Sequence, residues 1–253
     1  MFVPRVIPVL LLQGRGLVKT VKFNDGKYIG DPINAVKLFN DLKADELIFL
    51  DILATKGKRE ILHDLVADIG SQANMPFAVG GGIKTLNDIQ NIIAKGAEKV
   101  VINSHALRCP DFIRDAASNF GSSTISVCMD VKATWLGGKK VWSHASQKAT
   151  NYDPVAYARL MQDLGAGELI VQSVDKDGVM GGYDIPLIKA ISEAVTIPVV
   201  ALGGAGCLAD ISTVCKDGYA SAVGVGSLFV YQSSKRGVLI NYPSRSDIRA
   251  LFR

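Results

Sequence analysis

Short runs of apolar residues alternate along the chain with longer stretches in which apolar residues recur at helical spacing. In the stretches 32–42, 85–94 and 154–164 they fall at positions i, i+3 and i+4, which predicts amphipathic helices. The short runs are continuous in Val, Ile and Leu, as is typical of strands buried on both faces of a parallel sheet. The eight runs span residues 5–11, 46–51, 76–79, 99–103, 124–130, 168–173, 198–202 and 221–225.

The second half of the chain repeats the first at one constant offset. Asp31-Pro32 matches Asp153-Pro154, an offset of 122 residues, and each pair is typical of a helix N-cap followed by proline. Chance does not hold one offset over many positions, so the sequence indicates a duplicated unit. Further matches at this offset are Glu46-Leu47-Ile48 with Glu168-Leu169-Ile170, Gly81-Gly82 with Gly203-Gly204, and Asp88-Ile89 with Asp210-Ile211.

Eight strand–helix units in two sets of four predict an α/β fold, a (β/α)8 TIM barrel built from two duplicated half-barrels. We expect half-barrels over about residues 1–121 and 122–253, closed into a single domain over residues 1–253. The length suits one barrel of this kind, and a hydrophobic fraction of 48% excludes a disordered chain.

The net charge and the cysteine pattern restrict the kinds of ligand and the cellular compartment that we expect. A net charge of +4 without a run of basic residues disfavours nucleic acid but leaves phosphorylated small molecules as ligands. The sequence shows no membrane span and no signal-peptide pattern. The cysteines have no C-x-x-C spacing, which predicts reduced thiols and a cytoplasmic protein. They are Cys109, Cys128, Cys207 and Cys215.

Small and glycine-rich loops follow the third, fourth, seventh and eighth predicted strands. Ligands of such barrels bind at the carboxyl ends of the strands, and glycine lets backbone N–H groups approach an anion closely. We therefore expect two anion sites facing each other across the mouth, for a long ligand with a phosphate or similar group at each end; glycines that only make tight turns are the alternative. The expected ligand-binding residues are Gly81, Gly82, Asn103, Ser104, Gly203, Gly204, Gly226 and Ser227.

Four further residues are candidates for ligand contact at the same face. Asp177 and Gly178 belong to the loop after the sixth strand, for which a solvated acidic turn is the alternative. Asp51 ends the second strand, and Lys19 lies in the loop after the first.

Asp130 is the candidate acid–base residue, because it ends the fifth apolar strand and faces the mouth. Burial there raises the pKa of a carboxyl group, which suits proton transfer; a residue that caps the next loop is the alternative. The matching position at the end of the first strand is Leu11, so a mechanism with two aspartates across the barrel is not available.

Metal, cofactor and nucleophile chemistry find no support in the sequence. His63, His105 and His144 are isolated and have no ligand spacing, and no G-x-S-x-G motif occurs. The segment 131–148 resembles a β-hairpin with Gly137-Gly138 at its turn, and we expect it to cover part of the mouth.

Four charged residues stand at or near the starts of four strands, on the bottom face of the barrel. They are Arg5, Glu46, Lys99 and Glu168. Inward-pointing charges must pair, because unpaired burial is costly, and two bases with two acids can form a closed salt-bridge ring. Taken alone, such a ring is usually a stabilising feature.

With these residues in place, the chain resembles the HisF-type cyclase subunit of imidazole glycerol phosphate synthase, a class I glutamine-amidotransferase system. The resemblance implies a HisH-like glutaminase subunit that docks on the barrel floor and releases ammonia, which travels through the barrel to the mouth. It implies an ammonia gate at Arg5, Glu46, Lys99 and Glu168, and an acidic docking position at Glu98. The most specific segments are residues 5–8, 45–52, 79–83, 99–104, 175–178 and 203–206.

The chain departs from that family at the catalytic positions. The second catalytic aspartate of the family matches Asp130, but the first matches Leu11; its usual Thr and Ser are Gln172 and Leu202. The resemblance therefore implies a lyase-type subunit whose ammonia route is kept and whose cyclase chemistry is altered. We expect a divergent paralogue linked to surface-polysaccharide (acetamidino sugar) biosynthesis, with a sugar amidotransferase as a third protein.

Three other functions remain open. The first is the authentic histidine-pathway cyclase, which converts PRFAR and ammonia to imidazole glycerol phosphate and AICAR, with Asp51 or a water replacing the lost aspartate. The second is a single-subunit sugar-phosphate isomerase, which needs paired aspartates, so Leu11 counts against it. The third is a non-catalytic scaffold.

Overall fold

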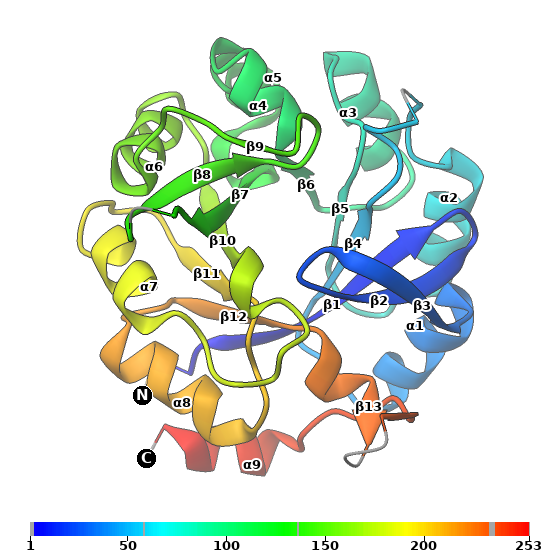
Figure 1. Cartoon of the computed structure of the whole chain (residues 1–253). Coiled ribbons are helices and arrows are strands. Elements are labelled where there is room, and N and C mark those ends of the chain that lie inside the picture. Colours follow the sequence, from blue (N-terminus) through cyan, green and yellow to red (C-terminus); the bar gives the residue numbers. More distant parts are fainter. Residues whose placement is uncertain (1–2, 58, 136, 233–235, 253) are drawn as a thin grey trace.

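The computed structural model describes residues 3–57, 59–135, 137–232 and 236–252. Within these residues, eight parallel strands lie at the centre of the molecule and helices surround them (Figure 1). In order around the wall, the strands are β1 (Arg5–Gln13), β4 (Leu47–Asp51), β5 (Phe77–Gly80), β6 (Lys99–Ile102), β7 (Ile125–Ala133), β10 (Glu168–Ser173), β11 (Val199–Leu202) and β12 (Ala222–Val225).

Pairing of the first and last strands closes this sheet into a barrel. β12 pairs in parallel with β1, and β10 pairs in parallel with both β7 and β11. The predicted (β/α)8 TIM barrel is therefore confirmed. Each predicted strand overlaps an observed one, because strands buried on both faces have an unbroken apolar sequence.

The helices begin where the sequence offers capping groups. The Asp31 carboxylate accepts a hydrogen bond from the backbone N–H of Asn34, and Asp153 caps the equivalent helix of the second half, so both predicted N-caps are confirmed. The helices are α1 (Pro32–Asp41), α2 (His63–Gln72), α3 (Leu86–Ile93), α4 (Ser104–Arg108), α5 (Asp111–Phe120), α6 (Pro154–Asp163), α7 (Ile185–Ser192), α8 (Leu208–Asp217) and α9 (Arg245–Leu251).

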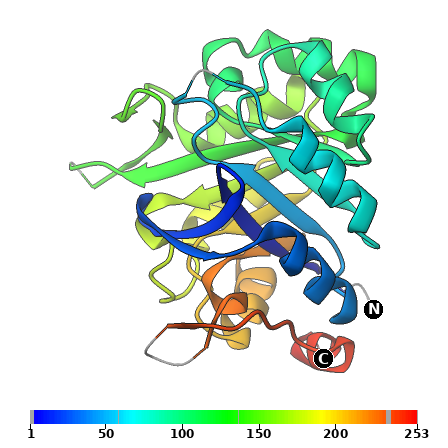
Figure 2. The same ribbon diagram turned by 90° about the vertical axis from the view of Figure 1, so that its right-hand side faces the viewer.

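An antiparallel hairpin that the sequence did not predict extends β1 beyond the barrel. It consists of β2 (Gly16–Val21) and β3 (Asn24–Gly30), and β2 pairs with the end of β1. Figure 2 shows this hairpin at the same end of the barrel as the hairpin after β7. A short hairpin of β13 (Tyr231–Gln232) and β14 (Gly237–Val238) precedes α9.

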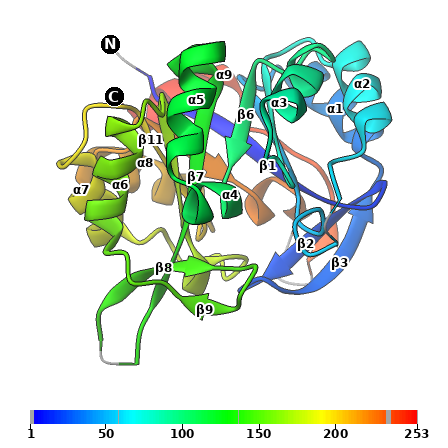
Figure 3. The same ribbon diagram turned by 90° about the horizontal axis from the view of Figure 1, so that it is seen from above.

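The predicted hairpin after β7 is confirmed. β7 pairs with β8 (Lys139–Ser143), and β9 (Lys148–Ala149) follows. Its tip projects away from the barrel (Figure 3), with Trp135 98% exposed, and residue 136 lies outside the described residues. The segment 131–148 nevertheless covers part of the mouth, as expected, because His144, Ala145 and Gln147 in the turn between β8 and β9 line the cavity.

Two apolar layers hold the fold together. The larger layer lies between the barrel wall and the helices, and the smaller fills the inside of the barrel. Leu11 and Leu50 pack on the inner layer from above. In the described parts of the chain, no helix is long and apolar enough to cross a membrane. The inner layer consists of Ile7, Val9, Ile48, Ala78, Val101, Cys128, Ile170, Val200, Leu202 and Ala222.

Candidate functional site

A cavity of about 810 Å³ opens at the carboxyl ends of the strands. Polar groups from both halves of the barrel meet there, as expected for a (β/α)8 fold. The structure brings together in this cavity Asp130 and all residues expected to contact a ligand, namely Lys19, Asp51, Gly81, Gly82, Asn103, Ser104, Asp177, Gly178, Gly203, Gly204, Gly226 and Ser227.

The glycines in the pairs after β5 and β11 all have positive φ angles, a backbone conformation that residues with side chains rarely adopt. φ is +73° at Gly82 and +123° at Gly204. A Cβ atom at Gly82 would lie 2.5 Å from the carbonyl oxygen of Arg59, and one at Gly204 would lie 2.3 Å from that of Gly182. Glycine is therefore required by loop packing at these positions, whatever ligand the loops hold.

Asp130 is buried within β7, three residues before its last residue, Ala133, and one described side chain donates a hydrogen bond to it. The amide nitrogen Nδ2 of Asn103 lies 3.0 Å from its Oδ2 atom. Burial, reinforced by the charge of Asp177 and opposed by the Asn103 hydrogen bond, raises the pKa of Asp130 to about 7. A carboxyl group that titrates near neutrality is suited to general acid–base catalysis.

Leu11 occupies the position that corresponds to Asp130 in the other half of the barrel. Leu11 lies opposite Leu50 in the β1–β4 ladder, and Asp130 lies opposite Gln172 in the β7–β10 ladder. Leu50 and Gln172 are related by the repeat offset, so the register supports the equivalence of Leu11 and Asp130. Leu11 lines the cavity but brings no group that can transfer a proton.

Lys19 reaches the centre of the mouth from the unpredicted hairpin. Its buried Nζ atom donates a 2.6 Å hydrogen bond to the carbonyl oxygen of Val9. Burial lowers the pKa of Lys19 to about 8, against the opposing effect of Asp177. Asp177 accepts hydrogen bonds from Thr20 Oγ1 (2.9 Å) and Gln172 Nε2 (3.2 Å), which ties the hairpin to the loop after β10.

Asp51 lines the cavity, but donors of its own loop already surround its carboxylate. Oδ1 accepts the backbone N–H groups of Leu53 and Ala54, both at 3.0 Å. The Arg59 guanidinium binds both carboxylate oxygens, at 2.7 and 3.1 Å. This arrangement fixes the loop after β4, and it counts against Asp51 as a replacement for the missing aspartate.

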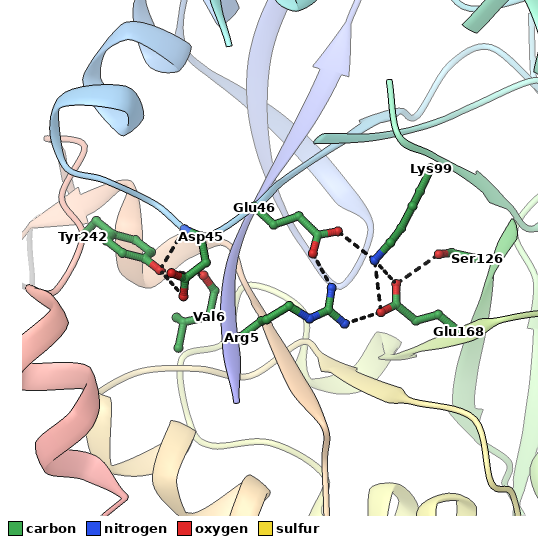
Figure 4. Close-up of polar contacts among 8 residues, drawn as sticks. All are labelled: Arg5, Val6, Asp45, Glu46, Lys99, Ser126, Glu168 and Tyr242. Atoms are coloured by element: carbon green, nitrogen blue, oxygen red, sulfur yellow. Dashed lines mark hydrogen bonds and ion pairs between the residues drawn. The ribbon is translucent and has the colours of Figure 1, made fainter. Parts of the chain in front are cut away.

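Four charged side chains form a closed ring at the opposite end of the barrel (Figure 4). Arg5 donates to Glu46 and to Glu168. Lys99 Nζ lies 3.2 Å from Glu46 Oε1 and 3.3 Å from Glu168 Oε1. Ser126 Oγ donates a further bond of 3.0 Å to Glu168. Each acid thus contacts both bases, so all four charges point inward and are balanced.

The ring keeps Glu168 ionised although this side chain is buried. Burial alone raises the pKa of Glu168, but Lys99 and Arg5 outweigh it and lower the pKa below its ordinary value. Glu98 is exposed beside the ring, next to Lys99 in sequence. The structure therefore places the predicted docking residue on an accessible surface at the floor.

The C-terminal segment contacts two of the four strand starts that carry the ring. The Tyr242 hydroxyl donates to the carbonyl oxygen of Val6 at 2.8 Å and accepts from the backbone N–H of Asp45 at 3.4 Å (Figure 4). Val6 adjoins Arg5 and Asp45 adjoins Glu46. Tyr242 thus links the two segments that present these ring residues.

Several cavity residues were not identified as site residues from the sequence. Each lies a few positions after a strand end, which is the signal that was available, but no motif joins them. Among the described residues, no group of three or more His, Cys, Asp or Glu side chains is placed to hold a metal ion. The additional lining residues with basic side chains are Lys56, Arg59, Lys84, His105, Arg108 and His144.

Comparison with known proteins gives one consistent family. The family model described as "Histidine biosynthesis protein" matches residues 5–235. A Pseudomonas aeruginosa protein, named provisionally as imidazole glycerol phosphate synthase subunit hisF2, is 44% identical over 94% of this chain and 95% of its own. Imidazole glycerol phosphate synthase subunit HisF of Alkaliphilus metalliredigens is 42% identical over 91% of this chain and 92% of its own. The chain therefore belongs to the histidine biosynthesis protein family and is HisF-like throughout the matched region.

Proposed function

We propose that this HisF-like chain receives ammonia from a HisH-like glutaminase subunit at the barrel floor and delivers it at the mouth to an acceptor other than the histidine-pathway substrate. The acceptor belongs to surface-polysaccharide biosynthesis, where a sugar amidotransferase makes an acetamidino sugar and acts as the third protein. The observation that carries the proposal is a closed ionic ring at the floor of a barrel whose mouth has Asp130 at one of two equivalent positions and Leu11 at the other.

The apolar interior of the barrel suits the passage of a small neutral molecule. Above the ring, Val, Ile, Ala, Leu and Cys128 side chains fill the interior up to the base of the cavity, so ammonia would pass between them. Neutral ammonia crosses such a lining far more easily than ammonium, because burial of an unpaired charge is costly. The four ring charges balance one another, so the ring must part to admit ammonia, which suits a gate.

The mouth supports altered chemistry. Ring closure of the histidine-pathway type needs an acid and a base on opposite sides, and the loss of one such group typically costs about 10²–10⁴-fold in rate. Leu11 lies where the second group would stand, and Asp51 is held by Arg59. The phosphate-type loops remain, so we propose that a phosphorylated ligand still binds.

An isotope experiment tests the route. The chain, its glutaminase and the sugar amidotransferase are supplied with glutamine labelled with ¹⁵N in the amide, in the presence of excess unlabelled ammonium. We expect the sugar product to carry mainly ¹⁵N, and Lys99→Met to lower that labelled fraction. Lys37→Met, on the exposed face of α1, is the matched control and should not change it. A ¹⁵N fraction in the sugar product equal to that of the free ammonium pool would refute the route.

A second candidate is the authentic histidine-pathway cyclase. The 42% identity with imidazole glycerol phosphate synthase subunit HisF of Alkaliphilus metalliredigens favours it. An assay of the wild-type chain with PRFAR and ammonium salt decides between the two. We expect turnover below about 1% of that of a histidine-pathway cyclase measured alongside it, given the missing proton-transfer group. Normal turnover would establish the second candidate instead.

A further inference from the structure

Basic side chains gather on one wall of the cavity. We call Lys56, Arg59, Lys84, His105 and Arg108 the basic wall; they come from the loops after β4 and β5 and from α4, directly after β6. All three elements belong to the first half of the barrel, and they flank the glycine pair after β5. One side of the mouth is therefore strongly positive.

Among the described residues, the equivalent loops of the second half contribute no such group to the lining of the cavity. The segment Gly81-Gly82-Ile83-Lys84 corresponds to Gly203-Gly204-Ala205-Gly206, so glycine replaces the lysine. A Cβ atom at Gly206 would lie 2.1 Å from the carbonyl oxygen of Met180, which leaves no room for a side chain. Among the described lining residues, the loops after β10, β11 and β12 supply no Lys, Arg or His. The two ends of the ligand site thus differ in charge, although they share a glycine pair.

Most of the charge of the basic wall is available to a ligand. Arg59 is neutralised by Asp51, but Lys56, Lys84 and Arg108 are exposed and form no salt bridge with any described side chain. The charges also act on one another. Burial first, and then Arg108 and Lys84, lower the pKa of His105, against the opposing effect of Asp88. A diphosphate offers the exposed cations of the basic wall more negative charge and more acceptor oxygens than a monophosphate does.

We infer that the first-half end of the cavity binds a diphosphate group, so that the acceptor carries a diphosphate at this end and a smaller or neutral group at the other. This inference rests on the proposed function in one respect: it takes the cavity to be the site where the acceptor binds. Lys84 and Arg108 are the specificity-determining residues of this end, because both line the cavity, Lys84 from the loop after β5 and Arg108 from α4, three residues after His105.

Calorimetric titration of the chain alone tests this inference. Inorganic phosphate and inorganic pyrophosphate are the probes, at constant ionic strength and pH 7.5, without any glutaminase. We expect pyrophosphate to bind at least about tenfold more tightly than phosphate, and Lys84→Gln/Arg108→Gln to abolish the difference. Lys37→Gln/Lys216→Gln is the matched control: it removes the same net charge from exposed helix positions and should preserve the difference.

Two results would overturn the inference. One is equal affinity of the wild-type chain for phosphate and pyrophosphate; the other is the same loss of discrimination in both double variants. A parallel titration with a nucleoside diphosphate identifies the source of the group, because affinity above that of pyrophosphate indicates a nucleotide-linked acceptor. A failure here leaves the ammonia route intact, since the isotope experiment measures that route separately.

Discussion

At the floor of the barrel, four charges balance one another in a closed ring, whereas at the mouth Asp130 and Lys19 are buried and form no ion pair with any described side chain. Each of the two has a neutral hydrogen-bond partner, Asn103 for the aspartate and the carbonyl of Val9 for the lysine. In the ring, the pKa of Glu168 is lowered and that of Arg5 is raised, so both stay charged, whereas the pKa of Asp130 is about 7 and that of Lys19 about 8. Ion pairing therefore stabilises the charged forms of the ring residues at the floor. Asp130 and Lys19 lack such partners among the described side chains, so their charges at the mouth change with pH and with bound ligand.

The largest change in activity is expected when a second acid is restored at the mouth. Leu11→Asp places a carboxyl group opposite Asp130, and we expect turnover of PRFAR with ammonium salt to rise by about 10² or more. Leu11→Asn is the matched control, since it is polar but transfers no proton. The interpretation fails if both variants remain equally inactive while the chain stays folded.

At the floor, Arg5→Ala tests whether pairing is what keeps the buried acids stable. Glu46 and Glu168 would then share Lys99 alone, and we expect the free energy of unfolding in urea to fall by about 2–3 kcal/mol. Arg15→Ala is a close control, because Arg15 also bridges two acids, Asp64 and Asp68, but on the exposed surface. A loss in Arg15→Ala as large as that in Arg5→Ala would contradict the argument.

The pH dependence of the free energy of unfolding tests the raised pKa of Asp130 at the mouth. Native Asp130 holds its proton to about pH 7, while the unfolded chain releases it near 3.8. The native state then binds more protons in this window, so its stability falls as pH rises. From pH 5 to 7.5 we expect wild type to lose roughly 2 kcal/mol relative to Asp130→Asn in urea unfolding. The exposed Asp41→Asn should follow wild type; a parallel course of Asp130→Asn and wild type would refute the shift.

The smallest expected effect concerns the support of the ring. Tyr242→Phe removes the hydroxyl between Val6 and Asp45, and we expect unfolding free energy to fall by about 1 kcal/mol. Tyr28→Phe, at a side chain that is 66% exposed, is the control. No difference between the two variants would show that the hydroxyl contributes nothing to the floor.

The barrel was predictable because its strands are continuous apolar runs and its helices start at Asp-Pro caps. The hairpin β2–β3 was not, since its residues alternate weakly and its turn lacks the usual signal. Lys22 and Phe23 have φ values of +52° and +64°, a conformation normally taken by Asn and Gly, and Asn24 stands one position too late. Contacts of Asp177 with Thr20 and the backbone of Phe23 hold this turn in place.

The site was predictable where it depends on strand ends. Asp130, the glycine pairs and the ring residues occupy fixed places in the barrel, so topology alone assigns them to mouth or floor. The basic wall was not predictable, because its members come from three separate segments and become neighbours only when the loops fold. The neutralisation of Asp51 by Arg59 likewise depends on the path of one loop.

Tyr242 binds Val6, the second residue of β1, so the C-terminal segment lies beside the start of the first strand (Figure 2). The start of β1 and helix α9 lie on the side opposite the two mouth hairpins. A purification tag or a surface tether fused to either terminus would therefore crowd the face on which a glutaminase is expected to sit. Gly137, whose Cβ position faces open space at the far end, offers an insertion point for a fluorophore that leaves that face clear.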